Sequence, residues 1–193
     1  DRETWHRGDV LRLLGNLGVV EDRADGLEAR RVGLLPAHEE ADVPAVVDAP
    51  AASQPLLAVV HKKLGVVPNL MKLLGQSPAA LEGYLSLSGA LDKGVLNAKL
   101  RESLALAVAE FNGCDYCLAA HSYIGKNLVK LTDDEIAQAR DGRAADARND
   151  AALRFAQRVA AERGRVLDAD IATLRAAGFS DAETVEIVLH VAL

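Results

Sequence analysis

One short segment, NGCDYC at residues 112–117, strongly limits how this chain can fold. Asn and Gly commonly end a helix, and here they follow a stretch rich in Ala and Leu that Asn97 can cap at its start. Cys114 then opens a second helical stretch that runs to about Gly125. The sequence therefore predicts two consecutive helices that turn at Gly113, as a helix hairpin.

Similar helix signals continue along the chain from about residue 46. Half of all residues are hydrophobic but only 4% are aromatic, a composition that favours packed helices, and no stretch alternates as a strand would. The predicted class is all-α, a compact antiparallel helical domain around residues 102–121. The other helix boundaries that the pattern predicts are Leu56–Leu64 ended by Gly65, a short segment after Pro68, a start at Ser77-Pro78 and an end near Gly94, a capping box at Thr132, a helix from about Asp150 to Glu162, a cap at Asp168, and a capping box at Ser180.

Net charge and hydrophobic runs narrow the function classes. The formal charge is −6, so the chain has no basic footprint for nucleic acid. No apolar run approaches the ~18 residues that a membrane-spanning helix requires, and no export signal opens the sequence. Together with a reduced thiol pair, these features predict a cytoplasmic protein.

The chain divides into an irregular start and a regular remainder. Residues 1–45 mix charged residues, short apolar runs and glycines, and we expect an N-terminal extension of uncertain order. Residues 46–193 form the predicted helical domain. Its last residues, VLHVAL at 188–193, lie inside an apolar helix without a stop signal, and we expect the domain to be cut short there. A small domain so rich in Ala and Leu is expected to self-associate.

The only two cysteines of the chain carry the candidate chemistry. In a helix, Cys114, Cys117 and His121 are spaced i, i+3 and i+7, which places them on one stripe. Two thiols at this spacing can form a disulfide, and His121 can take a proton from Cys117 one turn away. The preceding helix adds Glu102 and Glu110, and the turn at Gly113 can bring one of these carboxylates beside the thiols.

Other interpretations of the same residues stay open. Two buried cysteines can pack as small hydrophobic side chains, and a Cys/His cluster can bind zinc, although no second CxxC or His pair completes a structural site. Tyr116 is interpreted as a packing residue. His61 and His190 lie in apolar stretches and are interpreted as structural.

The pattern Glu102-x11-Cys114-x2-Cys117-x3-His121 resembles the signature of the alkylhydroperoxidase D-like proteins, in the carboxymuconolactone decarboxylase superfamily. The segment LGVVPNL at residues 64–70 also resembles the opening of its peroxidase-related branch. This resemblance implies an all-α fold, assembly into a dimer, trimer or hexamer, and thiol-dependent reduction of peroxides without a bound cofactor or metal.

The resemblance also implies roles for four residues. Cys117 attacks the peroxide, Cys114 resolves the product, and Glu102 and His121 relay protons. A dithiol reductant, such as a lipoyl-type or thioredoxin-like protein, restores the thiols. The best-known relay has a second histidine where this chain has Tyr116. The alternatives are a disulfide reductase, or a redox-sensing or zinc-binding assembly protein that uses the same motif.

Overall fold

The computed structural model describes residues 43–193. Residues 1–42, which make up nearly all of the predicted extension, lie outside the described residues, so the extension stays a prediction. Within the described part, every regular element is a helix, which confirms the all-α class. Contacts between residues divide this part into two units. One unit ends at Ala90, and the other begins at Leu91.

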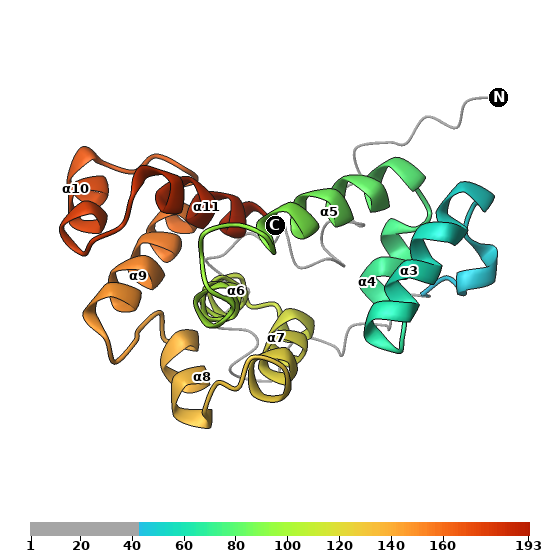
Figure 1. The fold of residues 1–193 in the computed structure, drawn as a ribbon, viewed down its shortest axis with the longest axis horizontal. Coiled ribbons are helices and arrows are strands. Elements are labelled where there is room, and N and C mark those ends of the chain that lie inside the picture. Colours follow the sequence, from blue (N-terminus) through green and yellow to red (C-terminus); the bar gives the residue numbers. More distant parts are fainter. Residues whose placement is uncertain (1–42) are drawn as a thin grey trace, which may run out of the picture. The chain divides into compact units, whose positions relative to one another are not determined.

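The first described unit contains two 3-10 helices, Val46–Asp48 (η1) and Ala51–Ser53 (η2), followed by three α-helices (Figure 1). These are α3 (Gln54–Leu64), α4 (Asn69–Leu74) and α5 (Pro78–Leu91). Gly65 ends α3 in the left-handed conformation with φ 76°, as the sequence predicts. The Ser77 hydroxyl accepts a hydrogen bond from the Ala80 amide at 3.3 Å, and this confirms the predicted start of α5. The helix ends at Leu91, three residues before the glycine that was expected to stop it.

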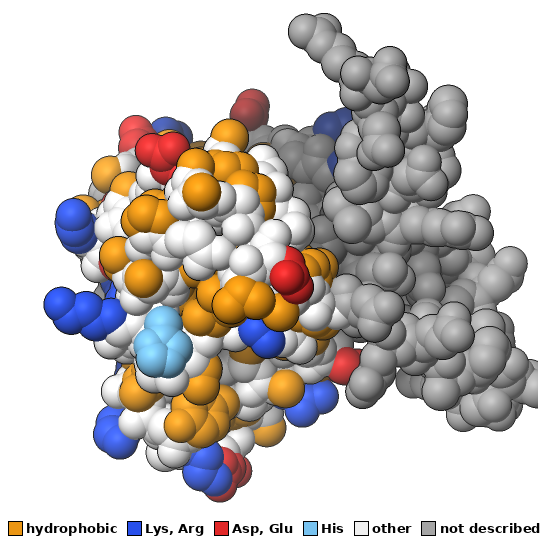
Figure 2. Space-filling view, turned by 90° about the vertical axis from the view of Figure 1, so that its right-hand side faces the viewer, with side chains coloured by type: hydrophobic (Ala, Val, Ile, Leu, Met, Phe, Trp, Pro, Cys, Tyr) orange, Lys and Arg blue, Asp and Glu red, His pale blue; other side chains and the backbone are white. Residues whose placement is uncertain are grey.

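A small core and an exposed apolar surface coexist in this unit. Ala49, Leu57 and Leu81 form the buried cluster, whereas Val47, Val59 and Val66 are 83%, 62% and 61% exposed. Figure 2 shows hydrophobic side chains spread over the face on which α3 and α4 lie in Figure 1. Single exposed apolar side chains are normal on protein surfaces, whereas contiguous apolar patches are typical of interaction sites. Self-association therefore stays a prediction.

The second unit is built around one central helix. It contains α6 (Ala98–Asn112), α7 (Asp115–Asn127), α8 (Asp133–Arg140), α9 (Ala147–Ala161), α10 (Asp168–Ala176) and α11 (Asp181–Ala192). Helix α6 packs against α7, α8, α9 and α11, while α10 packs against α9 and α11 (Figure 1). Along residues 43–193, no helix has both the length and the apolar character that crossing a membrane requires.

Local capping explains where most of these helices begin. The Asn97 side chain accepts from the Leu100 amide at 3.0 Å, and complete capping boxes at Thr132 and Ser180 open α8 and α11, all as predicted. Two predicted boundaries were wrong. Helix α9 begins at Ala147 because the Asp146 carboxylate caps it, earlier than the predicted Asp150. The cap of α10 is Leu167, so Asp168 is its first residue.

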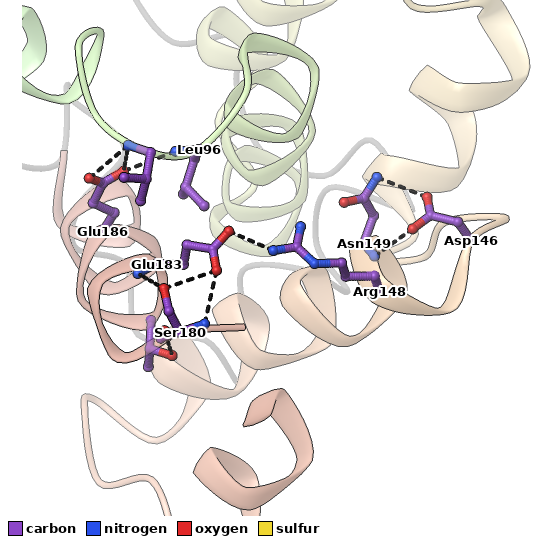
Figure 3. A network of polar contacts seen from close by, with 9 residues as sticks. Leu96, Asp146, Arg148, Asn149, Ser180, Glu183 and Glu186 are labelled. Carbon is purple, nitrogen blue, oxygen red and sulfur yellow. Dashed lines mark hydrogen bonds and ion pairs between the residues drawn. The ribbon is translucent and has the colours of Figure 1, made fainter. Parts of the chain in front are cut away.

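The contact of α11 with α9 is reinforced by charged side chains (Figure 3). Arg148 at the start of α9 donates to the Glu183 carboxylate at 2.5 Å, and its guanidinium lies 3.9 Å from the centroid of the Phe179 ring. The Ser180 backbone amide, which also donates to Glu183, lowers the pKa of that carboxyl group. These contacts hold the start of α11 in place.

The buried core of the second unit can be tested by substituting one of its leucines. Leu104 lies on α6 and is fully buried, so we expect Leu104→Ala to lower the free energy of unfolding by about 2–5 kcal/mol through lost burial and a residual cavity. Leu128, which is 61% exposed, supplies the matched control Leu128→Ala, with an expected change within about 0.5 kcal/mol. Urea unfolding measures both, and equal changes in the two variants would contradict this core assignment.

Candidate functional site

The turn between α6 and α7 brings the candidate residues together. Gly113 follows α6 with φ 65°, a left-handed conformation that is strained for residues with a Cβ atom. The Cys114 amide reaches back to the Ala109 carbonyl at 2.9 Å, which gives the 6→1 hydrogen bond of a Schellman motif. The predicted hairpin is therefore present, and its turn is set by residues that the sequence identifies.

Cys114 is the N-cap of α7 and not, as predicted, part of its first turn. Its φ and ψ of −89° and 92° are extended, and its Sγ accepts a hydrogen bond from the Cys117 amide at 3.2 Å. A sulfur atom thus occupies the capping position that Ser, Thr, Asp or Asn usually fills. The structure joins Cys114 and Cys117 by a disulfide, with their Cα atoms 5.3 Å apart.

Glu102 and His121 form a pair between the two helices of the hairpin. The Nδ1 atom of His121 on α7 lies 2.9 Å from the Glu102 Oε2 atom on α6. The His121 side chain is 34% exposed and the Glu102 side chain is 18% exposed, so the pair is partly shielded from water. His121 follows Cys117 by four residues, and the two therefore share one side of α7.

The contact with Glu102 determines what the His121 ring can do. An ionised carboxylate only accepts hydrogen bonds, so the proton in this contact belongs to Nδ1 of His121. In a neutral imidazole, Nε2 is then unprotonated and can accept a proton from a neighbouring group. A carboxylate–histidine pair of this type is the usual arrangement for activating an adjacent thiol or hydroxyl.

The sequence also singled out Glu110, His61 and Tyr116. The Glu110 carboxylate accepts from Arg140 Nε at 2.6 Å, so it pairs with α8 and not with His121. His61 is exposed on α3, in the other unit. Tyr116, interpreted as a packing residue, is 46% exposed, so its ring is not part of the core.

The sequence interpretation missed the environment of His190. This residue lies near the end of α11 as expected, but its Nε2 atom is buried and finds no hydrogen-bond partner among the residues that the structure describes. The sequence holds one indication of this environment, because His190 follows Glu186 by four residues within an otherwise apolar stretch.

Candidate metal ligands do not gather in the described part of the chain. Between residues 43 and 193, no group of three or more His, Cys, Asp or Glu residues is arranged to hold a metal ion. At the hairpin, the chain presents a disulfide and a hydrogen-bonded carboxylate–imidazole pair.

The carboxymuconolactone decarboxylase family model matches residues 78–162, the segment that contains the whole hairpin. Two solved structures are similar in fold, each with a TM-score of 0.68 over 78% of this chain and 81% of the other. One is an uncharacterized peroxidase-related protein from Silicibacter, at 26% identity. The other is an uncharacterized peroxidase-related protein from Ralstonia eutropha, described as an alkylhydroperoxidase AhpD core, at 29% identity.

A shorter match links the chain to a curated relative. An uncharacterized protein from Haemophilus influenzae is 46% identical over 48 residues, which are 24% of this chain and 42% of that protein. The chain thus spans less than half the length of this relative. The family match and the similar folds define a class of all-α, peroxidase-related proteins. Residues 78–162 of the chain thus match the carboxymuconolactone decarboxylase family, and the fold is similar to that of an alkylhydroperoxidase AhpD core protein.

Proposed function

We propose that this protein is a thiol-dependent peroxidase that reduces alkyl hydroperoxides through Cys114 and Cys117. One observation carries the proposal: the hairpin that holds the disulfide also holds a hydrogen-bonded Glu102–His121 pair, 2.9 Å apart, one helical turn from Cys117. The names of the two similar structures, both called peroxidase-related, add support.

The first half of the cycle oxidises the protein. His121 accepts the Cys117 proton, and the thiolate attacks the outer oxygen of the hydroperoxide. An S–O bond forms as the O–O bond breaks, and the departing alkoxide takes a proton to leave as an alcohol. Cys117 is then a sulfenic acid. The Cys114 sulfur attacks it, water leaves, and the S–S bond between the two cysteines forms.

The second half restores the thiols. A dithiol reductant attacks the disulfide through a mixed-disulfide intermediate and is itself oxidised to a disulfide. Two electrons and two protons thus pass from the reductant to the protein in each cycle. A lipoyl-type or thioredoxin-like protein is the proposed class of reductant. Glu102 supports His121 throughout by holding its ring in one tautomer and compensating its charge when it is protonated.

The decisive experiment follows both thiols after rapid mixing with peroxide. The reduced full-length protein should lose two free thiols per equivalent of cumene hydroperoxide or hydrogen peroxide. Mass spectrometry should then show a loss of two hydrogens within the peptide that contains Cys114 and Cys117. Protein alkylated at both cysteines before mixing is the control and should consume no peroxide.

Persistence of both free thiols at a stoichiometric excess of peroxide would overturn the proposal. If that protein nevertheless reduced a small disulfide with a dithiol donor, the disulfide reductase alternative would replace the peroxidase. The two functions are therefore separated by one set of samples.

A further inference from the structure

The disulfide joins two cysteines with different surroundings, and these surroundings bear on how the bond is reduced. In thiol–disulfide exchange, an incoming thiolate attacks one sulfur and expels the other, and the sulfur that is more stable as a thiolate leaves faster. Both cysteines are partly buried, so exposure does not single out one of them. The groups next to Cys114 and Cys117 therefore indicate which sulfur a reductant attacks.

Cys114 has a hydrogen-bond donor in place for the charge of a leaving sulfur. Its Sγ atom accepts from the Cys117 amide at 3.2 Å, at the N-terminus of α7. That amide belongs to the first turn of the helix, where amides have no partner within the helix. Hydrogen bonds to ionised groups are about twice as strong as those between neutral groups. This hydrogen bond thus gains strength when the S–S bond breaks and Cys114 becomes a thiolate.

The proton-transfer group beside Cys117 suits a different task. His121 lies one turn after Cys117 on the same side of α7. The Nδ1 proton of its ring is committed to the Glu102 carboxylate at 2.9 Å, so in the neutral ring Nε2 accepts a proton and cannot donate one. Neutral His121 therefore does not protonate a Cys117 sulfur that leaves first. It can instead remove a proton from a thiol that has arrived beside Cys117.

We propose that the reductant attacks the Cys117 sulfur, that Cys114 leaves as a thiolate, and that the mixed disulfide forms on Cys117. This assignment deepens the reductive half of the proposed cycle and rests on it. Cys114 thereby has a second role besides resolving the sulfenic acid. A sulfur that is stabilised as a thiolate is prepared both to attack the sulfenic acid and to leave the disulfide.

Two exchange steps complete the reduction. The first thiolate of the reductant forms a bond to the Cys117 sulfur, and the electron pair of the broken S–S bond goes to Cys114, which takes a proton from water. Nε2 of His121 then removes the proton of the second reductant thiol. The resulting thiolate attacks the first sulfur of the reductant and expels Cys117, which recovers that proton from His121. The reductant leaves as a disulfide, and both cysteines are thiols again.

The site of attack is measured without any peroxide. The full-length protein is oxidised with diamide, mixed with excess glutathione and quenched with N-ethylmaleimide at successive short times. Tandem mass spectrometry of the peptide that contains both cysteines locates each adduct. Extrapolated to the earliest times, glutathione on Cys117 with maleimide on Cys114 should exceed the reverse arrangement roughly tenfold. This ratio is the lower end of what a hydrogen bond to a charged group contributes.

The outcome separates this proposal from the proposed function. Glutathione predominantly on Cys114, or equally on both cysteines at the earliest times, would overturn the assignment. A protein that forms the mixed disulfide on Cys117 but does not react with peroxide would uphold the site of attack and overturn only the peroxidase function.

The second exchange step is tested with dithiothreitol as the reductant. His121→Asn should slow the release of Cys117 by roughly 10²–10⁴-fold, the usual effect of a lost base, so the adduct of dithiothreitol on Cys117 should accumulate in this variant. His61→Asn is the matched control, since His61 is exposed on α3 in the other unit, and its release rate should equal that of the wild type. Equal release rates in the two variants, or an adduct on Cys114, would contradict the proposed sequence of steps.

Discussion

Replacing Cys117 with Ser is expected to abolish the reaction with peroxide, whereas replacing Cys114 with Ser should leave one reaction and trap sulfenic acid on Cys117. Serine is nearly isosteric with cysteine but is a far weaker nucleophile without dedicated activation. The two variants therefore separate the attacking sulfur from the resolving one. Single-turnover rates with cumene hydroperoxide, and dimedone labelling detected by mass spectrometry, measure the two outcomes.

Two physical arguments favour different cysteines as the attacking thiol. Cys117 shares its side of α7 with His121, whose Nδ1 is committed to Glu102 and whose Nε2 can take a thiol proton. Cys114, in contrast, is the N-cap of α7, and its sulfur accepts the Cys117 amide at 3.2 Å, a position that favours an anion. We expect proton transfer to decide, since it activates the attacking group directly. A Cys117→Ser protein that consumes one equivalent of peroxide at the wild-type rate would reverse these roles.

Glu102→Gln and His121→Asn are each expected to slow the oxidation of Cys117 by roughly 10²–10⁴-fold, the usual effect of losing an acid–base group. Gln keeps the shape of Glu102 but removes the charge that supports His121. Asn removes the ring that accepts the thiol proton. The second-order rate constant with peroxide, measured under single-turnover conditions, gives the effect of each.

The double variant distinguishes a pair that acts as a unit from two independent contributions. If Glu102 works only by supporting His121, the double variant should be about as slow as His121→Asn alone, because residues that act as one unit are strongly non-additive. Glu110→Gln, a carboxylate lost from the same helix at its ion pair with Arg140, should stay within about threefold of the wild type. An equal loss of rate in Glu110→Gln and Glu102→Gln would contradict the assignment of Glu102.

Much of the secondary structure follows from the sequence because helix ends are local events. Asn97, Thr132 and Ser180 cap α6, α8 and α11 through hydrogen bonds to amides three residues away. Gly113 ends α6 with a positive φ. Each signal and its partner lie within one turn, so the chain needs no tertiary contact to define them. The same locality makes the Cys114–Cys117 disulfide predictable, because only two residues separate the cysteines.

Local signals failed where two residues competed for one role. Asp146 and Asp150 are both acidic residues near the start of α9, and only Asp146 caps it, because Asp150 binds Arg154 and Arg143 instead. The cysteine at 114 does not resemble the usual capping residues, and the sequence placed it inside α7. Its capping role depends on the sharp turn that follows Gly113.

The identity of the His121 partner was decided by tertiary structure. Glu102 and Glu110 both lie on α6, and spacing alone left the choice between them open. Packing of α6 against α7 turns Glu102 towards His121, while packing against α8 offers Arg140 to Glu110. The hydrogen bonds from the Val95 and Leu96 amides to the Glu186 carboxylate are also tertiary, since about half the chain separates these residues. Hydrogen bonds within a turn are specified by neighbouring residues, but side-chain partners on different helices depend on how those helices pack.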